Sequence, residues 1–170
     1  MTMPPWLLAA QKEIGTRELP ENRGPAIRRY IALAHCGAEG QPWCAIFVNA
    51  MLESTGFKGT RSPGSQTFRN NPSFQKLTGP ALGAIVVYWR IARTSGLGHV
   101  GFYNGEDAHG FISTIGGNES DMVRDELLNP HGNTFGLIGY YWPKAYPLPV
   151  IGKLPVQSVV VASSGTGKVV

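Results

Sequence analysis

Three residues far apart in the sequence have the types that nucleophilic cleavage of an amide bond requires: Cys44, His99 and Asn118. The attacking species is a thiolate, so a cysteine nucleophile needs a base to accept its proton and a third group to orient that base. An imidazole and an amide oxygen fill these two roles in cysteine hydrolases. Taken singly the residues are ordinary, because a cysteine on an apolar helix is usually a core residue and Gly-Gly-Asn is common turn sequence. Taken together they predict a nucleophile, a general base and an orienting group.

The residues around Cys44 predict a buried helix that begins at the cysteine. Pro42 and Trp43 lead into it, and apolar residues follow at three- and four-residue spacing, namely Ala45, Phe47, Val48, Met51 and Leu52. In the first turn of a helix, unpaired backbone N–H groups and the helix dipole favour the thiolate. The N–H of Cys44 is then the natural donor to an oxyanion, with Gln41 as a plausible second donor. We expect Trp43 either to line the cleft or to pack in the core.

His99 and Asn118 lie on extended segments that an antiparallel sheet would bring together. His99 stands at the start of one such segment and Asn118 at the end of the next. Antiparallel pairing would let Asn118 hold one ring nitrogen while the other faces the thiol. Glu119 and Asp121 are alternatives to Asn118, because a carboxylate raises the basicity of imidazole more than an amide does.

Helical patterns occupy the first third of the chain, and extended patterns follow. Helices are expected over residues 5–14, 25–36 and 44–55, and strands over residues 83–89, 99–103, 110–115 and 137–142. Residues 57–80 are rich in Gly, Pro, Ser and Asn and indicate a loop with at most a short helix at residues 66–69. Helices first and an antiparallel sheet second predict an α+β domain. We expect this domain to span residues 1–146, with residues 147–170 as an edge strand or a partly ordered tail outside it.

The composition is that of a folded protein, and its mildly positive net charge would suit anionic surroundings. The chain has 170 residues, 42% of them hydrophobic, with a net charge of +4. The basic residues are scattered rather than gathered in a stripe, so we expect no nucleic-acid partner. No segment approaches the roughly 18 apolar residues of a membrane span, and the first residues lack a signal-peptide pattern. We therefore expect no membrane span, and synthesis in the cytoplasm without export by the general route.

The two cysteines indicate neither a disulfide scaffold nor a metal centre. A chain of this size with only Cys36 and Cys44 lacks the pairs that stabilise small secreted domains. A zinc set drawn from His35, Cys36, Cys44 and His99 would match no usual ligand spacing. We expect no metal and no cofactor.

The chain resembles the cysteine peptidases and amidases of the NlpC/P60 and CHAP type, and within them a family of small phage- and bacteria-borne cell-wall hydrolases. The matching blocks arrive in family order and are Pro42–Asn49, Gly83–Val87, Gly98–Tyr103 and Gly116–Asp121, with Gly139–Pro143 near the end. The resemblance covers residues 5–146. It implies a papain-like fold in which the nucleophile begins a helix packed on a sheet. It also implies Cys44 as nucleophile, His99 as general base and Asn118 as the third member.

The resemblance further implies a substrate, bacterial peptidoglycan, whose amide bonds would be cut through a thioester. Whether the enzyme is an amidase or a stem-peptide endopeptidase stays open, as does its role as a phage lysin or a secreted antibacterial effector. It would reach the wall by lysis or by a dedicated secretion machine, and a secreted toxin would have a cognate immunity or inhibitor protein as partner. The alternatives are a non-catalytic wall-binding or phage structural module on the same fold, and a thiol acyltransferase.

Overall fold

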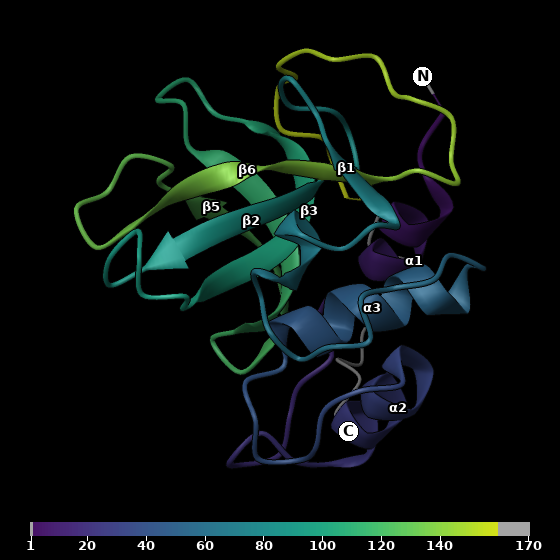
Figure 1. Ribbon diagram of the computed structural model, residues 1–170. Coiled ribbons are helices and arrows are strands. Elements are labelled where there is room, and N and C mark those ends of the chain that lie inside the picture. The colour runs from purple at the N-terminus through teal and green to yellow at the C-terminus, as the bar shows by residue number, and fades with distance from the viewer. Residues whose placement is uncertain (1, 160–170) are drawn as a thin grey trace.

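A computed structural model describes residues 2–159 and shows helices covering one face of an antiparallel sheet (Figure 1). The helices are α1 (Pro5–Glu13), α2 (Pro25–Ala34) and α3 (Cys44–Ser54), followed by the short 3-10 helix η1 (Thr67–Arg69). The strands are β1 (Phe74–Lys76), β2 (Ile85–Arg90), β3 (Gly98–Glu106), β4 (Ile112–Glu119), β5 (Met122–Leu128) and β6 (Phe135–Pro143). The predicted α+β class, with helices before strands, is confirmed.

The central element is α3, which packs between α2 and the sheet, with α1 on the opposite side of it from α2 (Figure 1). It contacts both of these helices and the strands β3 and β4. Residues 44–52 of this helix are all buried. A helix that is apolar on every face must be enclosed, because no orientation leaves a polar face for water. The first residue of α3 is therefore fixed against the sheet by the packing of the whole helix.

The six strands lie in the order β1-β6-β2-β3-β4-β5, and every pairing is antiparallel. Two of them were not predicted. Strand β1 has three residues at the sheet edge, within the expected loop. Strand β5 has Arg124, Asp125 and Glu126 at its centre, and such a run of charges is depleted in strands. Both strands are formed by pairing with a neighbour rather than by local preference.

Strand β4 contains an extra residue near its end, and this decides which side chain faces β3. Against β5, Gly116 pairs with Arg124 whereas Glu119 pairs with Met122, so the register shifts between the two pairs. Asn118 has a φ of 57°, in the left-handed region. In a regular strand residues 116 and 118 would share a face, but a bulge moves that face one residue along. Glu119 therefore takes the place that regular alternation gives to Asn118.

The segment after β6 runs back along the sheet. The N–H of Glu106 donates to Leu154 O at 2.8 Å, and the N–H of Gln157 donates to Asn104 O at 2.9 Å. Glu106 and Pro155 form one isolated parallel bridge, not a strand. The described part of the expected tail is thus hydrogen-bonded to the end of β3, and residues 160–170 lie outside the described residues. None of the helices within residues 2–159 has the length and apolar character needed to cross a membrane.

Candidate active site

Cys44 is the first residue of α3, and the residue is 7% exposed. Trp43 precedes it as N-cap and provides no side-chain hydrogen bond to the first turn. Interactions with the backbone of Ala45 and Val100 favour the ionised form of the Cys44 thiol. The thiol thus lies beside the backbone of both the helix and β3, an environment that favours the thiolate.

His99, near the start of β3, joins Cys44 to Glu119. The imidazole is hydrogen-bonded to the thiol, and its Nε2 lies 2.7 Å from Glu119 Oε1. Since Nε2 contacts the carboxylate, Nδ1 is the ring nitrogen left for the sulfur. The side chains of His99 and Glu119 are 15% and 3% exposed. The thiol, the imidazole and the carboxylate therefore form a series of interacting groups that is largely shielded from solvent.

The electrostatics of these three side chains favour a thiolate–imidazolium pair. Burial lowers the pKa of His99, but its hydrogen bonds to Cys44 and Glu119 outweigh burial and raise that pKa to about 10. Burial raises the pKa of the Cys44 thiol, but the hydrogen bond and charge of His99 bring it below its ordinary value. Burial raises the pKa of Glu119 to about 7, against the opposing effect of His99. The second carboxylate oxygen, Oε2, is buried without a hydrogen-bond partner in the described residues, in keeping with a large desolvation cost.

The structure brings together two of the three residues expected to do the chemistry. Cys44 and His99 are in contact, but the group at the second ring nitrogen is Glu119 rather than Asn118. Asn118 occupies the bulge of β4, and Asp121 is exposed in the turn that follows. The carboxylate alternative at position 119 is the one that the geometry supports.

Two adjacent glycines in β4 leave space for neighbouring groups: Gly116 for the His99–Glu119 pair, and Gly117 for the start of α3. A Cβ at Gly116 would lie 2.8 Å from Glu119 Oε1 and 3.3 Å from His99 Nε2. A Cβ at Gly117 would lie 2.6 Å from the Trp43 ring. Both positions therefore need glycine for space rather than for a turn. Paired glycines within a strand pattern were the available signal for this close approach.

The two residues expected to contact substrate have different environments. Trp43 does not line the cleft, because its side chain is fully buried and its Nε1 donates to Glu18 Oε1 at 3.1 Å. The core alternative is thus the correct one for Trp43. Gln41 is exposed beside Cys44, and its Oε1 accepts from Ala38 N–H at 3.0 Å. The Nε2 group of Gln41 remains available to a substrate.

An open cleft of about 270 Å³ leads to the thiol. Its lining residues are Gln41, Pro42, Cys44, Pro63, Gly64, Ser65, Arg90, Gly96, Leu97 and Gly98. The loop that follows α3 and the loop between β2 and β3 form its two walls. Gln66 Nε2 donates to Leu97 O at 2.9 Å and ties the walls together. The cleft is large enough for a few bonds of a polymer chain, not for a bulky folded partner.

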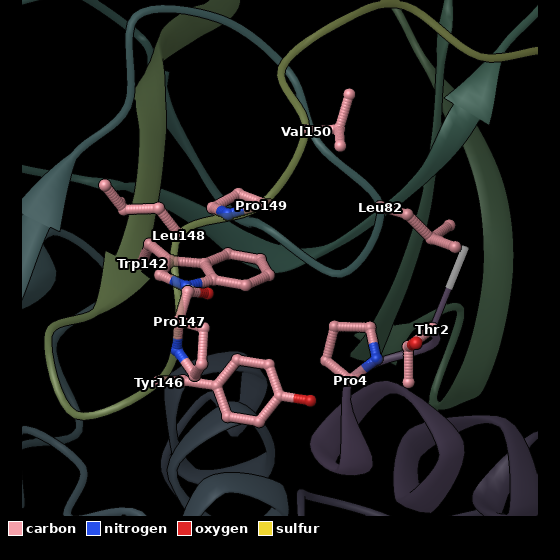
Figure 2. Close-up of a pocket in the computed structure, with 9 residues that line it drawn as sticks. All are labelled: Thr2, Pro4, Leu82, Trp142, Tyr146, Pro147, Leu148, Pro149 and Val150. Carbon is pink, nitrogen blue, oxygen red and sulfur yellow. The ribbon is translucent and has the colours of Figure 1, made fainter.

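A second cavity, of about 410 Å³, lies away from Cys44 (Figure 2). It is enclosed by residues before α1 and by the proline-rich segment after β6, and the Tyr146 hydroxyl points toward Pro4. Its walls are mostly apolar and contain no thiol, imidazole or carboxylate. Its hydroxyl groups, on Thr2 and Tyr146, have no imidazole or carboxylate beside them in the lining, so the cavity lacks a nucleophile paired with a base.

The remaining cysteine and histidines form no comparable site. Both cysteines are free, and Cys36 is half-buried. Burial raises the pKa of the Cys36 thiol. Within residues 2–159 no group of three or more His, Cys, Asp and Glu side chains is arranged to hold a metal ion. Cys44 is thus the cysteine with both an activating base and access to a cleft.

A thiolate beside an imidazolium at a helix start can attack a carbonyl carbon and return a proton to the departing group. The geometry fits acyl chemistry and gives no direct information on the acyl group. The chain matches no protein-family model, no curated protein and no solved structure.

Proposed function

We propose that the protein is a cysteine hydrolase that cleaves amide bonds in bacterial peptidoglycan, on a papain-like scaffold of the NlpC/P60 and CHAP type. The observation that supports this reaction is that Cys44, His99 and Glu119 interact in series, at the start of a buried helix and beside an open cleft. The substrate class is supported by the resemblance of the sequence blocks around these residues. The blocks beginning at Pro42, Gly98 and Gly116 supply the nucleophile, the base and the bulge of β4.

The first half of the reaction forms a thioester. The Cys44 sulfur bonds to the amide carbon, and the carbonyl oxygen becomes an oxyanion next to the helix N-terminus. In this scheme the N–H of Cys44 and the Nε2 group of Gln41, both from residues that line the cleft, donate to that oxygen. The C–N bond then breaks as His99 gives its proton to the leaving amine.

The second half returns the enzyme to its starting state. His99, now neutral, removes a proton from water as the water oxygen attacks the thioester carbon. The C–S bond breaks, a carboxylic acid is released and the thiolate is restored beside the imidazolium. Glu119 contacts no substrate atom in this scheme. Its role is to hold the ring orientation and to stabilise the imidazolium in both halves.

Release of soluble muropeptides from purified sacculi tests the proposal. We expect Cys44→Ala to abolish release, because no other described thiol has a base beside it. Cys36→Ala is the matched control and should release products at the rate of the unchanged protein. Undiminished release by Cys44→Ala would exclude the thiol mechanism and leave a non-catalytic wall-binding role as the better explanation.

The mass of the products defines both the bond and the acceptor. Cleavage by water adds the mass of one water, whereas an acyltransferase given an added amine would produce the corresponding amide. We propose water as the acceptor, and dominant transfer to the amine would replace hydrolase by acyltransferase. The masses also separate an amidase from a stem-peptide endopeptidase.

The proposed site of action is the cell wall, reached after lysis or through dedicated secretion. For a secreted toxin the expected partner is an immunity protein that inserts into the Cys44 cleft. Such a protein should protect Cys44 from alkylation in the complex, and an inhibitor that leaves the thiol reactive would bind elsewhere.

A further inference from the structure

We propose that Arg90 selects substrates with a free carboxylate next to the bond that is cut. This inference rests on the proposed function and deepens it by naming the chemical feature that the cleft recognises. Arg90 ends β2 and lines the same cleft as the Cys44 thiol. A guanidinium presents planar paired donors that match a carboxylate, so Arg is suited to recognise this group.

Among the described Lys, Arg, Asp and Glu residues, only the basic Arg90 lines the cleft. Residues 54–105 contain six Lys and Arg residues and no Asp or Glu. Both walls of the cleft, residues 63–65 and 96–98, come from this stretch. The cleft lining itself includes Arg90 and no carboxylate. An anionic group near Arg90 would meet a guanidinium and no carboxylate side chain in the lining.

Arg90 differs from the neighbouring arginines because its side chain has no partner among residues 2–159. Arg61 is paired with Glu53 at 3.0 Å, and Arg69 donates to Gln66 Oε1 at 2.8 Å. The Arg93 guanidinium lies over the Trp89 ring, 5.4 Å from its centre. Within residues 2–159 the Arg90 guanidinium forms no ion pair. It is therefore free to pair with a ligand.

Hydrogen bonds fix the backbone of Arg90, although its side chain forms no ion pair with any described residue. Its N–H donates to Leu97 O at 2.9 Å, and its carbonyl accepts from Ser95 Oγ at 2.6 Å. The bond from Gln66 to the same Leu97 carbonyl fixes this loop to the opposite wall. A charge on a fixed backbone loses less conformational freedom on binding than one on a mobile loop.

Other groups in the cleft are also donors. Gln41 offers its Nε2 group, since its oxygen is used by Ala38. The Ser65 hydroxyl lies on the facing wall. Together with the start of α3, these groups make a cleft suited to a carboxylate and poorly suited to an ammonium group. A carboxylate and the corresponding carboxamide are close in size and differ in charge, so the selection has a direct chemical test.

The experiment compares two synthetic muropeptides that differ in one group, a free carboxylate or a carboxamide beside the scissile bond. We expect the unchanged protein to prefer the carboxylate by about tenfold in kcat/KM, the size of a charge-assisted hydrogen bond in a partly solvated cleft. Arg90→Gln should bring this ratio close to one, mainly through a higher KM for the carboxylate. Arg90→Glu should reverse the preference.

Arg93→Gln is the matched control, because it removes the same charge three residues further along the chain, from a residue that does not line the cleft. It should keep the preference of the unchanged protein. Equal cleavage of the two peptides by the unchanged protein, or a preference that survives in Arg90→Gln, would overturn the inference while leaving the proposed function intact. Failure to cleave either peptide, with an inert thiol, would overturn both.

Discussion

Replacing Glu119 by Gln tests the Cys44–His99–Glu119 interaction through the pH dependence of the reaction rate. The substitution keeps the size of the side chain and an oxygen near His99 Nε2, and it removes the charge. In the unchanged protein the negative carboxylate helps to raise the pKa of His99 to about 10. The active pair exists above the lowered pKa of Cys44 and below the raised pKa of His99. Above that range no proton is left for the leaving amine.

The size of the effect follows from the hydrogen bond that loses its charge. A hydrogen bond to a charged group contributes about 1.5–3 kcal/mol, and a neutral one about 1 kcal/mol. The difference corresponds to an alkaline limb about one pH unit lower in Glu119→Gln. At pH values at which the carboxylate is ionised, the same difference lowers kcat about tenfold.

The reaction rate at low pH provides a second, independent test of the role of Glu119. The pKa of Glu119 is raised to about 7, so below that pH the unchanged protein has a neutral carboxyl group at position 119. A neutral acid resembles a neutral amide in charge. The rates of the two proteins should therefore converge as the pH falls below about 7 and separate as it rises.

The assay is kcat/KM for a defined muropeptide between pH 5 and about 10.5, a span chosen to include the pKa values of both Glu119 and His99. Asn118→Gly is the matched control, because glycine accepts the left-handed φ of 57° and the Asn118 amide is not the group at His99. It should keep turnover within about twofold, the scatter of a neutral surface change. A constant ratio between Glu119→Gln and the unchanged protein at all pH values would refute the reasoning, as would a large loss in Asn118→Gly.

Two further predictions concern packing and reactivity. Gly117→Ala should lower the free energy of unfolding by about 1–3 kcal/mol, because the added Cβ would clash with Trp43. Thermal denaturation measures this loss. Gly152→Ala is the control and should change stability little, because a Cβ at Gly152 has nothing within 4 Å. Iodoacetamide at neutral pH should alkylate Cys44 well before Cys36, because the pKa of the first thiol is lowered and that of the second is raised. Peptide mass spectrometry reads the order, and preferential labelling of Cys36 would contradict it.

The sequence predicted the parts of the fold that have strong local patterns. The helix that begins at Cys44 follows from a dense apolar run after a proline and an aromatic residue, and it appears as Cys44–Ser54. Strands β2 and β6 are rich in β-branched and aromatic residues and were placed within a few residues of their true bounds. In these segments local preference and tertiary packing favour the same structure.

The position of the carboxylate depends on a feature that side-chain preference does not encode. Regular alternation places residue 118 on the face of Gly116, and the single bulge in β4 moves that face to Glu119. The bulge depends on a left-handed φ at Asn118 and on the two-residue turn at Ser120 and Asp121, both also left-handed. Asn, Ser and Asp are compatible with many turns, so their types alone did not define this one.

The burial of Glu119 is more readily explained by chemistry than by stability. Its pKa of about 7 is above the ordinary value, so ionisation of this group makes the folded protein less stable as the pH rises through 7. Its Oε2 is also buried with no partner among the described residues. An apolar side chain of similar volume would avoid both costs, and replacing buried ion pairs in this way is often stabilising. Only the imidazole that it contacts, and through it the thiol beside the cleft, gives the carboxylate a use at this position. The simplest account is that this part of the sheet is shaped to hold a charge that the reaction requires.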